Sequence, residues 1–240
     1  MRLALIPLRV WPRQVERNLA ELERRLEEAA HFSPDLVCLP ECTLTGYLYD
    51  QADLERFAET LSGALVARFS ELARRFKVYL CAGLLERALE GVYDTALLFD
   101  GEGRLLGYHR KIEEQPPFLC GQTFRPIESD LGRLGILICG DLFNEDAVRQ
   151  ARHAADLLLV PMSRGLDGRS PDPDRWEAEE RAAYLDAARA TKTIVAMVNA
   201  LELEAPAPAF GGALVVNAEG LVVGESPHGS DEILFVEIAK

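Results

Sequence analysis

The sequence has no long hydrophobic run, and this absence excludes the membrane-spanning classes of protein. None of its apolar segments approaches the ~20 residues that a helix needs to cross a bilayer. The opening MRLALIPLRV is too short an apolar stretch, and too soon followed by Trp-Pro-Arg, to be a signal peptide. We expect it to form a buried strand, and we expect a cytoplasmic protein with no membrane partner.

Positive charge is also scarce. The chain has 26 Lys and Arg against 39 Asp and Glu, a formal net charge of −13, and no stripe of basic residues. Nucleic acids and anionic membranes bind to such stripes, so neither is expected as a main partner. Lysine is the rarer base, with four copies at positions 77, 111, 192 and 240. Because arginine supplies most of the positive charge, a lysine at a special position is informative.

Cysteine and histidine are too scattered for a disulfide framework or a zinc site. Five cysteines stand at positions 38, 42, 81, 120 and 139 without a Cys-X-X-Cys pair, and the four histidines do not cluster with them. An odd number at irregular spacings does not fit a secreted scaffold, and zinc needs grouped ligands. We expect reduced thiols and no metal.

The chain does contain an order of elements that occurs twice. Apolar runs alternate with amphipathic stretches as βαβαββ in each half. The clearest repeat is ALLFDGEGRLLG (96–107) against ALVVNAEGLVVG (213–224), and DLVCLPE (35–41) matches DLLLVPM (156–162). Continuous apolar strands are typical of sheets covered by helices. Two such halves in one domain, residues 1–240, predict an α/β fold with four layers, an α-β-β-α sandwich. A single doubly wound sheet is the alternative.

The expected elements follow from the spacing of apolar residues. The first half is expected to contain strands at 3–8, 35–41 and 78–85, helices at 14–30 and 53–76, and a hairpin over 95–111. The second half is expected to contain strands at 133–139, 156–162 and 193–200, helices at 144–155 and 176–190, and a closing hairpin from 210.

The repeat helps to separate scaffold from chemistry. Positions alike in both halves are expected to serve packing, whereas a reactive group without a counterpart is a candidate for function. Three such groups stand at strand ends: Glu41 (matched by Met162), Cys139 (matched by Leu8) and Lys111 (matched by His228).

Cys139 ends the apolar strand in GILICGDLFNE (135–145). A helix capped by Asn144 follows, and a helix N-terminus or a cation lowers the pKa of a thiol from about 8.5. Gly140 is expected to let the backbone turn sharply. The sulfur would then lie at the carboxyl end of a strand, where open α/β sheets bind ligands. A buried structural cysteine is the alternative for this residue taken alone.

Glu41 and Lys111 supply an acid and a cation. Glu41 follows Pro40 after a buried run, and partial desolvation would raise its pKa towards the range of a general base. Lys111 ends a hairpin strand and would stabilise the oxyanion formed when a thiolate attacks a carbonyl. Each residue alone also fits a solvated loop position. His109, on the same face of the strand as Lys111, is the rival partner for Cys139.

Three segments resemble the signature motifs of the nitrilase superfamily, the carbon–nitrogen hydrolases. They are LPECTLTGY (39–47), GYHRKIEE (107–114) and GILICGDLFNE (135–145), in that order. The resemblance continues through DLLLVPMS, the helix over 176–190 and the last hairpin, so it covers essentially the whole chain. It implies an α-β-β-α sandwich, a homodimer, a Glu–Lys–Cys triad, and no metal or organic cofactor.

By that resemblance Glu41 is the general base, Lys111 stabilises the transition state, and Cys139 is the nucleophile. Many members have a further glutamate beyond the lysine, and Glu114 is the candidate for it here. The sequence departs from the family at Gly140, where a bulky residue is usual. Residues near the motifs are candidates to line the substrate pocket, namely Tyr47, Gly140, Phe143, Arg164 and Trp176.

The resemblance implies hydrolysis of a small amide, of ω-amide or N-carbamoyl type, through a thioester on cysteine. Carboxylate and ammonia or an amine are the products. Nitrile hydrolysis is less expected, because most branches of the family act on amides. Two alternatives are a glutaminase-like enzyme that supplies ammonia to a separate partner, and a non-catalytic binding protein on the same fold.

Overall fold

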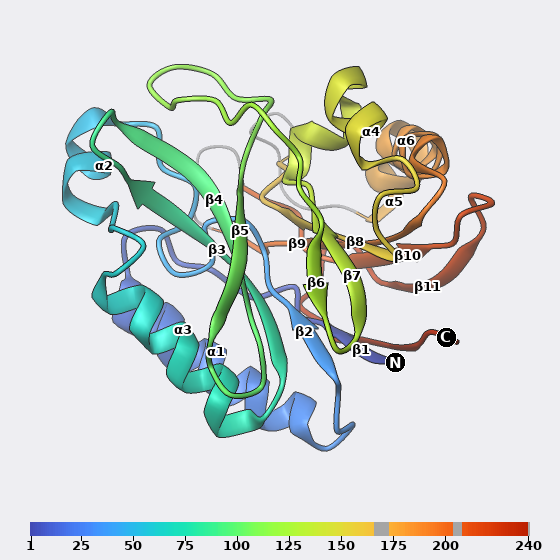
Figure 1. Cartoon of the computed structure of the whole chain (residues 1–240), viewed down its shortest axis with the longest axis horizontal. Coiled ribbons are helices and arrows are strands. Elements are labelled where there is room, and N and C mark those ends of the chain that lie inside the picture. Colours follow the sequence, from blue (N-terminus) through green and yellow to red (C-terminus); the bar gives the residue numbers. More distant parts are fainter. Residues whose placement is uncertain (166–172, 204–207, 240) are drawn as a thin grey trace.

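The computed structural model describes residues 1–165, 173–203 and 208–239, and in them two six-stranded sheets lie face to face (Figure 1). The first sheet has the order β12-β1-β2-β3-β4-β5, with β1 (Arg2–Leu5), β2 (Leu36–Cys38), β3 (Tyr79–Arg87), β4 (Val92–Phe99), β5 (Leu105–Arg110) and β12 (Leu234–Glu237). The second has the order β11-β10-β9-β8-β7-β6, with β6 (Ile127–Ser129), β7 (Gly132–Ile136), β8 (Leu157–Met162), β9 (Ile194–Asn199), β10 (Ala213–Val216) and β11 (Val222–Ser226).

Helices cover the outer face of each sheet (Figure 1). In the first half these are α1 (Val15–Ala30) and α3 (Ala64–Phe76), whereas the short α2 (Gln51–Phe57) packs through Leu54 in a separate cluster with Leu85 and Phe118. Those of the second half are the 3-10 turn η1 (Cys139–Phe143), α4 (Glu145–Ala151), α5 (Pro173–Arg175), the π-helical η2 (Trp176–Glu180) and α6 (Arg181–Thr191). None of the described helices is long and apolar enough to span a bilayer.

The two halves have the same pairing pattern. Strands β1, β2 and β3 are parallel and continue into the antiparallel β4 and β5, just as β7, β8 and β9 continue into β10 and β11. The expected duplication is therefore present in the strand order itself. The last strand, β12, returns to pair with β1, and the Met1 amino group donates to the carbonyl of Ile238 at 2.9 Å.

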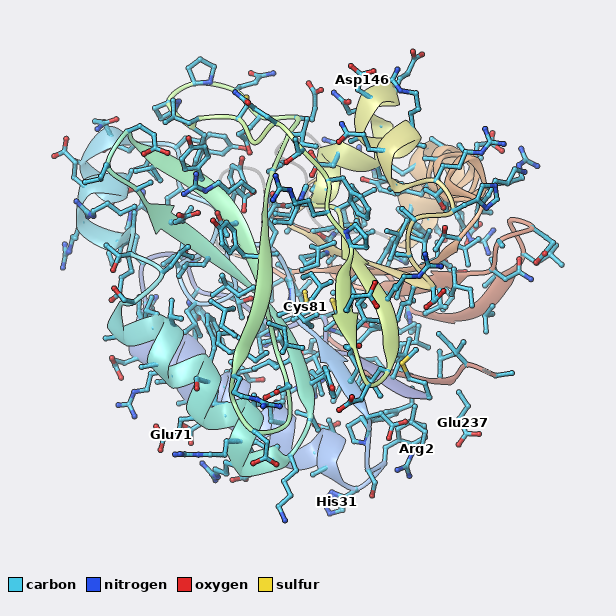
Figure 2. All side chains as sticks on the ribbon, in the orientation of Figure 1. Arg2, His31, Glu71, Cys81, Asp146 and Glu237 are labelled. Carbon is cyan, nitrogen blue, oxygen red and sulfur yellow. The ribbon has the colours of Figure 1, made fainter. Side chains whose placement is uncertain are left out.

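Three apolar cores separate the four layers. The central one joins the inner faces of both sheets and includes Leu5, Cys81, Ile136 and Leu159. Figure 2 shows Cys81 in this interior, while Glu71 of α3 and Asp146 of α4 lie on the outside of the molecule. The outer cores place α1 and α3 on one sheet and α4 and α6 on the other. The predicted α-β-β-α sandwich is confirmed, and the single doubly wound sheet is wrong.

Some predicted boundaries are wrong. The single helix expected over 53–76 is divided into α2 and α3, because the backbone turns extended at Ala58 and Glu59 pairs with β3. The helix capped by Asn144 ends at Ala151, since the backbone leaves the helical region at Arg152, with ψ of 118°, and His153 is left-handed, with φ of 58°. The short strands β6 and β12 were not expected.

Candidate active site

The three residues at predicted strand ends follow β2, β5 and β7. Glu41 lies three residues beyond the end of β2, Lys111 directly follows β5, and Cys139 begins the turn η1 after β7. Glycine at position 83 makes room for the first of these loops. A Cβ atom there would lie only 2.3 Å from the backbone nitrogen of Cys42, so the strand β3 can pass under the loop only without a side chain.

Lys111 lies at the centre of a group of oxygen atoms. Its Nζ is 2.7 Å from Oε1 of Glu41, 2.7 Å from Oε2 of Glu114 and 3.5 Å from Oδ2 of Asp94. It also donates to the hydroxyl of Tyr47 at 3.4 Å. The lysine side chain is only 7% exposed. Although burial opposes its charge, the carboxylates around it raise the pKa of Lys111, so the site keeps an ammonium group.

Glu41 is held from two sides. One carboxylate oxygen accepts from Lys111, and the other accepts from the backbone N–H of Ser163, at 2.7 Å, just beyond β8. The residue is 1% exposed. These two donors fix the orientation of the buried carboxylate between Lys111 and Ser163.

Cys139 has an unusual backbone for a residue with a side chain. Its φ is 45°, in the left-handed region that favours glycine. Gly140 is not among the residues with positive φ, so the expectation that Gly140 makes the sharp turn is wrong. The left-handed residue of the turn η1 is instead Cys139, its first residue. Strain of this kind, of the order of 1–3 kcal/mol, is found where a side chain must point in one particular direction.

The sequence predicted a lowered pKa for the thiol of Cys139, and the structure indicates a raised one. Burial first, and the charge of Glu41 second, raise its pKa, against the opposing effect of Lys111 and of the Ser163 N–H. Its ordinary state is therefore the neutral thiol. The charges of Glu41 and Lys111 thus act in opposite directions on the pKa of this thiol. A thiolate would form only with a base ready to accept the proton.

Asp141 ties the cysteine turn to the lysine loop. One of its oxygens accepts from the backbone N–H groups of Ile112 (2.7 Å) and Glu113 (2.8 Å), directly after Lys111. The other accepts from Ile138 N at 3.0 Å and from Nε2 of His109 at 2.8 Å. His109, the rival partner for the cysteine, thus pairs with Asp141 instead.

Of the remaining predicted residues, Glu114 and Tyr47 contact Lys111 directly. They belong to the lysine cluster, the group that Lys111 forms with Glu41, Tyr47, Asp94 and Glu114, and the Tyr47 hydroxyl donates to Oε2 of Glu114. Arg164 follows Ser163 and pairs with Glu180 at 3.0 Å. Gly140 packs near Glu113, where a Cβ atom would find ordinary contacts.

Phe143 and Trp176 lie apart from the lysine cluster. Phe143, 49% exposed, places its ring edge against Tyr184 at 4.9 Å. Trp176 is buried, stacks on His228 at 3.7 Å and donates to Glu225. Among the residues that the structure describes, no hydrogen bond or ring contact joins either one to the triad.

Sequence reasoning missed three groups at this site. They are the carboxyl of Asp94, the carboxylate of Asp141 and the backbone N–H of Ser163. Asp94 lies within the largely apolar strand β4, and the matching position of the second half is Gly211, so the comparison of halves offered a signal for it. A backbone N–H carries no signal in the sequence.

Three carboxylates surround Lys111 in an arrangement that could also hold a metal ion. In the described part of the chain, the carboxylates of Glu41, Asp94 and Glu114 form a group whose oxygen atoms lie within 4.8 Å of one another, as metal ligands do. The ammonium of Lys111 lies among them and already supplies the positive charge.

Comparison with known proteins gives a consistent picture. The chain matches the sequence model described as carbon-nitrogen hydrolase over residues 2–240. It is 29% identical over 244 residues to the chloroplastic omega-amidase of Arabidopsis thaliana, covering 93% of this chain and 63% of that protein. It is 29% identical over 250 residues to omega-amidase NIT2 of Xenopus tropicalis, covering 98% and 86%. A solved carbon-nitrogen hydrolase from Helicobacter pylori G27 has a TM-score of 0.84 at 23% identity, covering 98% of this chain and 88% of that one.

Proposed function

The chain belongs to the carbon–nitrogen hydrolase family, and we propose that it hydrolyses the carbon–nitrogen bond of a small amide through a thioester on Cys139. The observation that carries this proposal is the buried pair of Glu41 and Lys111, at 2.7 Å, acting together on one cysteine. A base, a cation and a thiol in one site are the groups that thiol-based acyl transfer needs.

The first half of the proposed reaction acylates the enzyme. Glu41 takes the proton from Sγ of Cys139 as the sulfur attacks the amide carbon. The oxyanion that forms is stabilised by Lys111 and by the backbone N–H of Gly140. Glu41 then returns the proton to the nitrogen, the carbon–nitrogen bond breaks, and ammonia or an amine leaves the thioester behind.

The second half releases the acid. Glu41 removes a proton from water, and the resulting hydroxide attacks the thioester carbon. The carbon–sulfur bond breaks, and Glu41 returns its proton to the departing sulfur, which gives a carboxylic acid and the thiol. Because burial keeps the resting thiol neutral, the attack requires that Glu41 take the proton of the thiol. Glu114 and Tyr47 hold the ammonium of Lys111 in place throughout.

For the substrate we propose a small ω-amide, whose far end is a carboxylate. The two curated relatives described above are omega-amidases, at 29% identity. Arg164 supports the same class, since it directly follows Ser163, whose backbone N–H binds Glu41, and its side chain is 39% exposed. Its guanidinium is paired with Glu180, so a substrate carboxylate would share or replace that partner.

Arg164→Gln tests the substrate class. We expect the KM for an ω-amide acid to rise about tenfold or more while the KM for a neutral amide of equal length stays unchanged. An equal change for both compounds, or none, would remove the carboxylate from the proposal and leave neutral amides and N-carbamoyl compounds as candidates.

Ammonia release from a panel of amides, ω-amides, N-carbamoyl compounds and nitriles tests the hydrolase proposal. Cys139→Ser is expected to abolish release, whereas Cys120→Ser, at an exposed thiol, serves as the matched control and keeps it. Release that survives in Cys139→Ser would contradict the proposed nucleophile. No release from a folded, reduced wild type would favour the partner-dependent or non-catalytic alternatives.

We propose a homodimer on the basis of the family resemblance alone. Sedimentation velocity over a range of protein concentrations measures it directly. A species of about twice the 26.6 kDa chain mass is the expected result, and a monomer at every concentration would contradict it.

A further inference from the structure

Asp94 is a buried acid that the proposed reaction does not use. It lies in β4, is 1% exposed, and its backbone carbonyl accepts from the N–H of Lys111 at 2.9 Å. Among the described residues, the donor to Oδ1 is the weak thiol of Cys42, at 3.9 Å. Oδ2 forms no hydrogen bond to any residue that the structure describes, although it lies 3.5 Å from Nζ of Lys111.

The charges around Asp94 do not balance if every acid is ionised. Three carboxylates, those of Glu41, Asp94 and Glu114, share the single ammonium of Lys111, and each of the four side chains is at most 7% exposed. Like charges at this separation in a desolvated site strongly favour retention of a proton by one of the acids.

The hydrogen-bond donors identify which acid retains it. Glu41 accepts from Lys111 and from Ser163 N. Glu114 forms an ion pair with Lys111 and accepts from the Tyr47 hydroxyl and from the backbone N–H of Gln115. Such donors stabilise a charged carboxylate, and Asp94 has only the distant thiol. Burial first, and then the charge of Glu41, raise the pKa of Asp94 well above its usual range.

We infer that Asp94 is a positioning residue of this site, which holds a proton at neutral pH and donates it in a hydrogen bond to the carboxylate of Glu41. That bond would give the unpaired Oδ2 its partner and fix Glu41 between Lys111 and Cys139. The inference deepens the proposed function and rests on it for its effect on rate, but the protonation of Asp94 stands on the geometry alone.

Loss of this proton at alkaline pH would then stop the reaction. A second full negative charge would appear beside Glu41 and compete for the ammonium of Lys111. It would also make the thiol of Cys139 harder to ionise, since a negative charge on Asp94 raises the pKa of that thiol. The titratable groups that face Asp94 from the surrounding segments are Glu41, Cys42, Tyr47, Lys111, Glu114 and Cys139.

Infrared spectroscopy tests the protonation without relying on activity. Wild type labelled with ¹³C-aspartate should show, at neutral pH, the carbonyl stretch of a protonated aspartic acid, and Asp94→Asn should lack it. The aspartate label separates this band from Glu202, a second buried acid whose pKa is raised. If the wild type lacks the protonated-acid band at neutral pH, or if Asp94→Asn keeps it, the inference is overturned, whether or not the protein hydrolyses any amide.

The rate experiment compares Asp94→Asn with Asp94→Ala on the best amide of the panel. An Asn amide can donate to Glu41 as the acid does, so kcat at neutral pH should stay within about threefold, and the alkaline loss of activity should move to higher pH. Asp94→Ala has no donor, and its kcat should fall by about tenfold or more at similar KM. An Asn variant about 100-fold slower at neutral pH, or with an unmoved alkaline limb, would overturn the inference.

Discussion

Lys111 and Glu41 are 70 residues apart in the sequence, and their side chains meet at 2.7 Å in the interior of the protein. The contact joins the loop after β2 to the end of β5, on the two sides of the hairpin of β3 and β4 in the first sheet. A buried pair of this kind contributes little to stability once its desolvation is counted. Its position beside a strained cysteine points to chemistry.

Replacement of Lys111 should abolish activity in the folded protein. In Lys111→Met the oxyanion loses its cation, and we expect kcat to fall by about 100-fold or more. Lys192→Met, at the exposed end of α6, removes a lysine of the same shape and should keep full activity. Ammonia release at saturating amide measures both, and retained activity in Lys111→Met would contradict the role given to the ammonium.

Asp141 should matter chiefly for stability and for the geometry of the cysteine turn. Asp141→Asn replaces one carboxylate oxygen, which accepts two hydrogen bonds, by a donor that cannot accept them. We expect a loss of about 2–4 kcal/mol in the free energy of unfolding. Asp146→Asn, at the exposed start of α4, is the matched control with an expected change below about 1 kcal/mol. Urea unfolding distinguishes them, and equal losses would contradict this role.

The buried carboxyl of Glu202 should make stability depend on pH. Burial raises its pKa from 4.5 to about 7 in the folded protein. As pH rises between these values the unfolded chain loses the proton first, so the folded state loses stability, on the order of 3 kcal/mol across the window. Below it both states are protonated and the effect is absent.

Glu202→Gln removes that titration while keeping the shape of the side chain. Urea unfolding of both proteins at about pH 5 and about pH 8 gives the comparison. Wild type should lose more stability than Glu202→Gln between the two values. Parallel changes in the two proteins would show that Glu202 does not titrate in this range.

Much of the fold could be predicted because its signals are local. The amphipathic spacing of α1 and the apolar runs of β3 and β8 depend on near neighbours in the chain, and the repeat supplied the four layers. The strands β6 and β12 were not predicted. They have only three and four residues, and their pairing with β7 and β1 is a tertiary property.

The candidate site was predictable where a side chain has no counterpart in the other half. Glu41, Lys111 and Cys139 were found in this way, and the structure brings Glu41 and Lys111 into contact. The backbone of Cys139 and the raised pKa of its thiol were not predictable, since both arise from packing around the turn. Asp94 also has no acidic counterpart in the other half. Its protonation, however, depends on how many donors reach each carboxylate, which only the structure shows.

The most direct measurement is the mass of the enzyme stopped with acid during turnover of its best amide. An increase equal to the acyl group, located by peptide mapping on Cys139 and absent from Cys139→Ser, is the expected result. Ammonia released under single-turnover conditions with no acyl group on the protein, or with the acyl group on another residue, would contradict the thioester on Cys139.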